Sequence, residues 1–112
     1  MNSVVSRPLI LTVYITGPSQ ECLETMAQTL LAEKRIACAN LMAPHQSYYS
    51  WQGEMKNELE WAMLLKSQIP LQDSLEKRIS ELHPFETPCI LFHKLECEPQ
   101  FHNWVVEQTS GI

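Results

Sequence analysis

Residues 37–67 read ACANLMAPHQSYYSWQGEMKNELEWAMLLKS, and this stretch decides the fold. It contains two long segments, 37–50 and 54–67, on either side of Trp51-Gln52-Gly53. The first segment is largely apolar, and in the second, apolar side chains alternate with others. Because a glycine-containing turn joins two strand-like segments, the pattern predicts a β-hairpin.

The arms of this hairpin are long for the size of the chain. An arm of about fourteen residues spans on the order of 45 Å, whereas a strand usually has about five or six residues. A compact domain of this length has a radius of gyration of only about 13 Å. The tip is therefore expected to project beyond the domain or to bend around something. In the alternative interpretation, Pro44 breaks the first arm and makes the hairpin ordinary, since proline in a strand implies an edge or a bulge.

The segment before the hairpin predicts a strand followed by a helix. Residues 9–16 (LILTVYIT) are apolar on both faces and rich in β-branched and aromatic side chains, which is typical of a buried central strand. Gly17-Pro18 breaks this strand, and Ser19 follows as a suitable helix N-cap. Apolar side chains then recur at helical spacing over residues 23–31, so we expect an amphipathic helix that ends near Lys34.

The segment after the hairpin repeats this pattern. Apolar residues at helical spacing over 71–82 predict a second helix, which Pro84 closes. Residues 89–95 form a further strand, and the apolar stripe in 101–105 predicts a short terminal helix. The order β-α-β-β-α-β with an appended helix predicts a ferredoxin-like α/β (α+β) sandwich, a single domain over residues 1–112 with both long helices on one face.

Charge and composition disfavour several classes of function. The chain has 8 basic and 13 acidic residues, a net charge of −5, whereas nucleic-acid binding requires a basic surface. It has no run of 18 apolar residues and no secretory signal pattern, so we expect no membrane partner and a cytoplasmic location. The three glycines form no phosphate-binding loop. The four cysteines lack C-x-x-C spacing and are expected to be reduced thiols.

The hairpin tip carries the aromatic residues Tyr48, Tyr49 and Trp51. A projecting strand edge with exposed aromatic side chains tends to pair with another chain. Aromatic residues also provide much of the binding energy at protein interfaces. We therefore predict a closed homo-oligomer with these three residues at the interface, and Trp51 as an anchor.

Four sequence blocks together resemble the CutA family of divalent-cation tolerance proteins. In order along the chain they are LAEKRIACAN at 31–40, SYYSWQG at 47–53, EWAMLLKS at 60–67 and HPFETP at 83–88. The resemblance implies a homotrimer with a layout similar to that of the PII signalling proteins, and a link to tolerance of copper and other divalent metals. It implies no settled catalytic reaction, so we predict a binding protein rather than an enzyme.

His83 is the candidate metal ligand. It lies at the end of a predicted helix and before a proline, so we expect its ring to face a cleft, and imidazole suits Cu²⁺ and Zn²⁺. The alternative is a favourable interaction between His83 and the helix dipole. The resemblance implies a site that adds a cysteine from the first strand and sometimes a preceding histidine, but these positions hold Ile15 and Leu82. A lone histidine is a weak site, because such metals normally take three or four ligands.

Glu60 is the candidate residue of a ligand cleft between subunits. It lies in an otherwise apolar strand, where a carboxylate is costly to bury unless it is paired. In one interpretation Glu60 lines the cleft with Lys66, and His83 is a further candidate for the same cleft; Glu86 is a poorer candidate. In the other, Glu60 is solvated or forms an ion pair across the trimer. Cys38 is interpreted as a small buried residue, because the sequence has no Cys–His signature of a nucleophile.

Two functions therefore follow from the sequence. The leading hypothesis is a trimer that binds divalent metal, most simply copper, and contributes to metal tolerance. The alternative is a PII-like signalling module in which the cleft near Glu60 and Lys66 binds an organic anion or a nucleotide. An enzyme that uses Cys38 or Glu60 is a third, disfavoured hypothesis.

Overall fold

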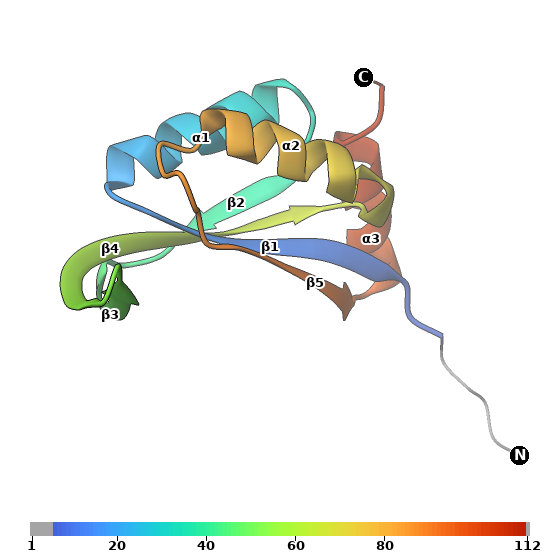
Figure 1. The fold of residues 1–112 in the computed structure, drawn as a ribbon. Helices are drawn as coiled ribbons and strands as arrows, with labels where there is room; N and C mark the ends of the chain where they lie inside the picture. Colours follow the sequence, from blue (N-terminus) through green and yellow to red (C-terminus); the bar gives the residue numbers. More distant parts are fainter. Residues whose placement is uncertain (1–5, 112) are drawn as a thin grey trace, which may run out of the picture.

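The computed structural model describes residues 6–111, and its elements follow the predicted order (Figure 1). The strands are β1 (Leu9–Gly17), β2 (Cys38–Leu41), β3 (His45–Trp51), β4 (Glu54–Ser67) and β5 (Ile90–Glu96). The helices are α1 (Gln20–Ala32), the short 3-10 helix η1 (Ile69–Leu71), α2 (Gln72–Leu82) and α3 (Pro99–Gln108). Ser19 caps α1 as predicted, because its Oγ accepts a hydrogen bond from the Cys22 amide at 3.1 Å.

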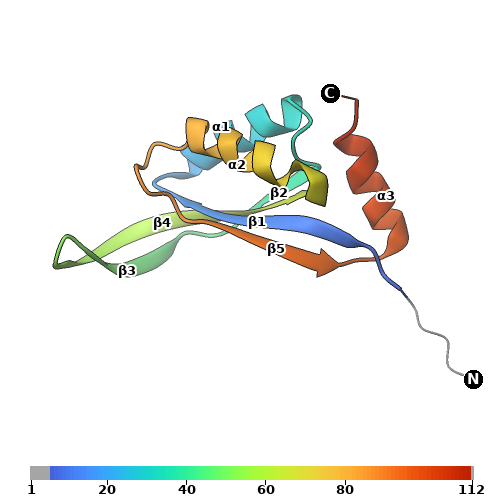
Figure 2. The ribbon, with the colours of Figure 1, turned by 45° about the vertical axis from the view of Figure 1, so that its right-hand side comes forward.

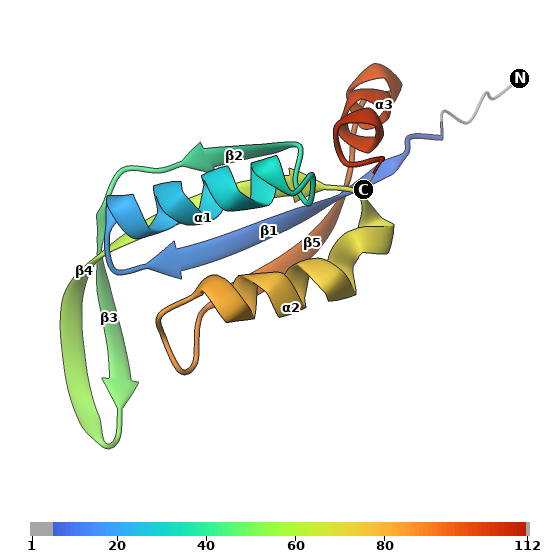
Figure 3. The same cartoon turned by 90° about the horizontal axis from the view of Figure 1, so that it is seen from above.

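The strands form one antiparallel sheet in the order β2-β4-β1-β5, and β3 pairs with the outer half of β4. This order is that of a split βαβ sandwich. Helices α1 and α2 lie on one face of the sheet, and α3 lies at its end (Figures 1 and 3). The predicted ferredoxin-like fold is therefore confirmed.

The core lies between the sheet and the helix pair. Leu11, Val13 and Ile15 are fully buried at alternate positions of β1, which places all three on the helix side. The helices add a buried apolar stripe, consisting of Leu23, Met26, Ala27, Leu30, Leu75 and Ile79. Within residues 6–111, none of the helices is long and apolar enough to span a membrane.

The first arm of the hairpin is not one strand, as the apolar stretch 37–50 suggested. Leu41 pairs with Met63 and His45 with Glu60, so three residues (42–44) lie opposite two (61–62). The extra residue makes this segment a β-bulge. The bulge contains Pro44, which has no amide hydrogen to donate to the ladder. Pro44 therefore breaks the arm, as the alternative interpretation held, but the hairpin is not an ordinary one, since its outer part projects (Figure 2). The second arm is continuous and keeps its predicted bounds.

Beyond the bulge, β3 and the outer half of β4 project from the body (Figures 2 and 3). The molecule measures 57 × 36 × 24 Å and has a radius of gyration of 16.0 Å, above the roughly 13 Å of a compact chain of this length. Gln52 and Gly53 close the hairpin with positive φ angles of 49° and 80°, as a two-residue turn of the primed type requires. The predicted projection of the tip is therefore observed.

The sheet face opposite α1 and α2 is covered by α3 only at one end. There Ile10, Ala37 and Val105 form a small second cluster of buried residues. Elsewhere Leu64 and Leu91 lie directly opposite Tyr14 on the two strands that flank β1. Directly paired residues share a face, so these three side chains form one row on this face, and Leu91 is 49% exposed. We call this side of the sheet, opposite α1 and α2, the open face.

An ion-pair cluster joins the end of α1 to α2. Arg78 donates to both carboxylate oxygens of Glu33, with Nη2 at 2.7 Å and Nε at 2.9 Å from them, and Arg35 Nε donates to the same carboxylate at 2.7 Å. These hydrogen bonds, first from Arg78 and then from Arg35, lower the pKa of Glu33 to about 2. Because the folded pKa is depressed, this contribution to stability is present above about pH 4.5 and is lost as the pH falls towards 2.

We therefore expect Glu33→Gln to reduce stability at pH 7 but to change it much less near pH 2.5, where most of the contribution from the lowered pKa of Glu33 has been lost. Urea unfolding of both proteins at the two pH values measures this difference. Glu81→Gln is the matched control, since Glu81 lies 3.7 Å from Arg78 and is 53% exposed. An equal loss for Glu33→Gln at both pH values would contradict the role of the ion pair.

Candidate functional site

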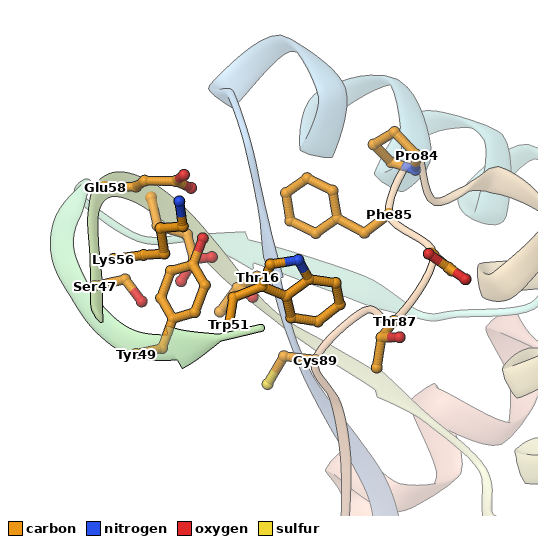
Figure 4. A pocket seen from close by; sticks show the side chains of 12 residues that line it. Thr16, Ser47, Tyr49, Trp51, Lys56, Glu58, Pro84, Phe85, Thr87 and Cys89 are labelled. Atoms are coloured by element: carbon orange, nitrogen blue, oxygen red, sulfur yellow. The ribbon is translucent and has the colours of Figure 1, made fainter. Parts of the chain in front are cut away.

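A cavity of about 700 Å³ lies between the projecting hairpin and the segment 84–89 that follows α2 (Figure 4). Ligand pockets typically have volumes of about 300–1,000 Å³, so this cavity has room for a small organic molecule. The hairpin contributes Ser47, Tyr49, Trp51, Lys56, Glu58 and Glu60. The opposite side consists of Thr16, Pro84, Phe85, Glu86, Thr87 and Cys89.

Strand alternation determines which hairpin side chains reach the cavity. Ser47 pairs with Glu58 and Tyr49 with Lys56, so these four side chains share one face of the hairpin. Trp51 continues the same face two pairs nearer the tip. Figure 4 shows Tyr49 and Trp51 projecting from the hairpin, with Phe85 entering from the other side. The cavity therefore has three aromatic walls from two distant segments.

His83 holds the far wall of the cavity in place. Its Nδ1 accepts a hydrogen bond from the Phe85 amide at 3.1 Å, so Nε2 carries the proton and donates to the Thr16 carbonyl at 2.7 Å. The residue is 93% buried, and its ring lies 5.0 Å from the Phe85 ring, centroid to centroid. Thr16 and Phe85 both line the cavity, so His83 acts behind its wall as a clamp that fixes where the 84–89 segment leaves α2.

This position differs from the expectation that the His83 ring faces a cleft. The ring is internal, because both of its nitrogens find backbone partners. A metal would have to displace one of these hydrogen bonds to reach a nitrogen. Over residues 6–111, no cluster of three or more His, Cys, Asp or Glu side chains is arranged to hold a metal ion. The positions of Ile15, fully buried, and Leu82, packed against the core, add no ligand.

The predicted cleft residues are only partly brought together. Glu60 and Glu86 line the cavity from opposite sides. Lys66 does not line it, since six residues of strand, on the order of 20 Å, separate it from Glu60. Lys66 instead donates to Asn40 Oδ1 at 3.0 Å, and its ammonium lies 5.8 Å from the centre of the Phe101 ring.

The structure also divides the predicted aromatic interface group. Tyr49 and Trp51 line the cavity, whereas Tyr48 lies on the opposite face of the hairpin and is 69% exposed. Cys38 is half-buried in β2, beside Lys66 across the ladder. Burial raises the pKa of the Cys38 thiol, and the Lys66 charge only partly opposes this effect. A thiol held in its neutral form is a poor nucleophile.

Lys56, Glu58, Phe85 and Cys89 are among the cavity residues that the sequence-based hypotheses did not propose. The alternation of charged residues over 54–60 was a usable signal, because it places Lys56, Glu58 and Glu60 on one face of the strand. Phe85 and Cys89 gave no such signal. They follow the end of α2, where the direction of each side chain depends on the path of the loop and not on the regular spacing of a helix or a strand.

The fold and the cavity together define a class of protein: a small α+β sandwich of ferredoxin-like topology with a ligand-sized cavity beneath a projecting hairpin. Comparison with known proteins gives the family. The model of the CutA1 divalent ion tolerance protein family matches residues 11–108. The divalent-cation tolerance protein CutA of Pyrococcus horikoshii is 36% identical over 102 residues, which cover 90% of this chain and 99% of that protein. This chain therefore belongs to the CutA1 divalent ion tolerance family.

Solved structures agree with this assignment. The divalent ion tolerance protein CutA1 from Ehrlichia chaffeensis superimposes with a TM-score of 0.87 at 30% identity, covering 95% of this chain and 99% of that one. A structure described as the PII-like protein CutA from Nostoc, in apo form, gives a TM-score of 0.82 at 30% identity and covers 89% and 97%. The predicted resemblance to the CutA family is thus confirmed, and the fold is PII-like.

Proposed function

We propose that this protein is a homotrimeric ligand-binding protein of the CutA family that contributes to the response to divalent metal ions. In this proposal the cavity beneath the hairpin is its ligand site. The observation that carries it is the cavity itself, which places three aromatic rings and several charged side chains around a volume suited to a small molecule. It is a binding function and requires no enzymatic step. The cytoplasmic location stays a prediction.

The trimer is supported by apolar surface that a single chain leaves uncovered. The open face has Leu91 at 49% and Leu95 at 51% exposure. On the back of the hairpin, Tyr48, Met55 and Leu59 are 69%, 85% and 53% exposed. Apolar groups concentrated in this way mark interaction surfaces, and copies of one chain usually bury them in a closed ring.

Direct binding of a divalent cation, copper in particular, is the second candidate. The family assignment favours it, and Glu58, Glu60 and Glu86 place carboxylate oxygens, which are metal ligands, on the cavity wall without forming a cluster arranged to hold a metal ion. His83 would join such a site only by giving up its hydrogen bond to Thr16 or to Phe85. The proposal therefore places any metal in the cavity rather than at a site built on His83.

One screen tests both candidates on tag-free protein. Light scattering should first give a mass of three times the 12.9 kDa chain. Thermal unfolding is then followed with Cu²⁺, Zn²⁺ and a panel of small organic ions. A ligand at one hundred times its Kd stabilises by about 2.7 kcal/mol, which raises Tm by several degrees. If no metal and no organic ion shifts Tm, the cavity is not a ligand site; a monomeric mass would contradict the trimer.

A further inference from the structure

The charge on the cavity wall is negative. Three carboxylates, Glu58, Glu60 and Glu86, face a single ammonium, that of Lys56, so the formal charge of the wall is −2. The Lys56 ammonium also forms an ion pair with Glu54, whose Oε2 lies 3.0 Å from Lys56 Nζ. Glu54 does not line the cavity. The only other basic residue expected near the cleft, Lys66, lies far along β4. The wall therefore repels an anion and attracts a cation.

Glu60 is the least exposed of the three carboxylates on the cavity wall. Its side chain is only 18% exposed, and its nearest ionisable partner is His45 Nε2 at 3.4 Å. A carboxylate withdrawn from water is costly unless it is paired. The contact with His45 is an ion pair only when the imidazole is protonated. A positive group entering the cavity would provide the missing partner.

The aromatic rings specify the kind of cation. Tyr49, Trp51 and Phe85 converge on the cavity (Figure 4) and keep 37%, 43% and 39% of their surface exposed. The neighbouring Glu58 carboxylate, and then burial, raise the pKa of the Tyr49 phenol, which keeps the ring neutral. Ring faces attract cations and also bind apolar groups, and aromatic cages hold alkylated ammonium ions. A hydrated metal ion would use the carboxylates but would leave the rings unused.

We propose that the ligand of this cavity is a small organic cation, an amine or quaternary ammonium group with an apolar portion, held by the aromatic rings and by Glu60 and Glu86. This inference rests on the proposed function and makes it specific. It replaces the organic anion or nucleotide that the sequence suggested for the cleft. The anion hypothesis depended on Lys66, which the structure places outside the cavity.

Calorimetry on the native assembly tests the proposal with choline, agmatine and spermidine as the probe cations. Adenosine triphosphate and citrate are the probe anions, and Cu²⁺ and Zn²⁺ are the metal arm. The measurements are made at pH 8, where imidazoles are neutral and do not compete with the ligand. We expect at least one organic cation to bind, with an affinity that falls as salt is raised.

Two variants with opposite charge changes determine whether the ligand is positively or negatively charged. Glu86→Gln should weaken cation binding at least threefold, whereas Lys56→Gln should leave it unchanged or strengthen it. Trp51→Ala should weaken it at least tenfold, and Trp51→Phe, which keeps a ring, should restore most of the affinity. Both charge changes are at the wall and outside the core, so folding is expected to be intact.

Each other outcome overturns the inference in a recognisable way. An anion that binds, and whose affinity Lys56→Gln lowers, would overturn the organic cation but leave the ligand cavity in place. Binding of Cu²⁺ or Zn²⁺ that Trp51→Ala does not affect, without binding of any organic cation, would establish the metal candidate instead. If none of the probes binds, the organic cation and the proposed cavity function both fail.

Discussion

Leu91→Glu is expected to convert the proposed trimer into monomers. Leu91 lies on the open face, opposite Tyr14, and half of its surface is exposed in a single chain. If three copies bury this face, the variant places three carboxylates in an apolar interface without partners. The penalty for one such group is several kcal/mol, and threefold symmetry repeats it three times. Light scattering should show the mass falling from three chains to the 12.9 kDa of one chain.

Gln28→Glu is the matched control for this prediction. Gln28 is exposed on α1, on the other side of the sheet, and the substitution adds the same single negative charge. It should leave the mass unchanged, and circular dichroism should show that both variants are folded. A Leu91→Glu protein that stays trimeric would mean that the open face is not the interface.

His83→Ala is expected to destabilise the fold by about 2–3 kcal/mol, because it leaves two backbone groups without their partner. The Thr16 carbonyl loses a hydrogen bond inside the protein, and the Phe85 amide loses the one that orients the 84–89 segment. The core also loses a buried ring. Urea unfolding in the presence of a chelator measures the effect without any metal contribution. The same variant should weaken ligand binding, since Phe85 is no longer held at the cavity wall.

Two further variants distinguish a clamp from a metal ligand. His83→Gln can still form one of the two hydrogen bonds, so its loss of stability should be smaller than that of His83→Ala. His102→Ala, on the half-buried side of α3, should change stability by less than about 0.5 kcal/mol. If His83→Ala is as stable as the wild type in chelator but no longer binds Cu²⁺, then His83 is a metal ligand and the clamp is wrong.

The bulge at residues 42–44 connects the fold to the site. Between the pairs Leu41–Met63 and His45–Glu60, the chain from β2 to β3 has one more residue than β4. The hairpin therefore bends where it leaves the sheet. The outer part of the hairpin is thereby separated from the sheet that α1 and α2 cover, and its inner face lies opposite the 84–89 segment (Figures 3 and 4). The cavity exists because the outer hairpin and the 84–89 segment diverge here and are not packed together.

The amino-acid sequence alone determined the elements, their order and the family. Residues 9–16 show the pattern of a buried strand, residues 23–31 show helical spacing, and residues 54–67 formed one continuous strand with the predicted bounds. Such periods are local, because they follow from how successive side chains point along a strand or a helix. The interpretation failed where a local pattern is ambiguous: the apolar stretch 37–50 gave no register, and Pro44 interrupted it.

Only the tertiary structure decided which side chains share the cavity and which partners they keep. His83 was expected to face a cleft, but both ring nitrogens are bonded to backbone groups, one of them 67 residues earlier in the chain. Lys66 and Glu60 lie on one strand, but only Glu60 lines the cavity. Glu86, from a distant segment, lines the same cavity from the opposite side. The physical reason is that charge and hydrogen-bond satisfaction depend on neighbours in space, and spacing along a sequence specifies neighbours only within a single element.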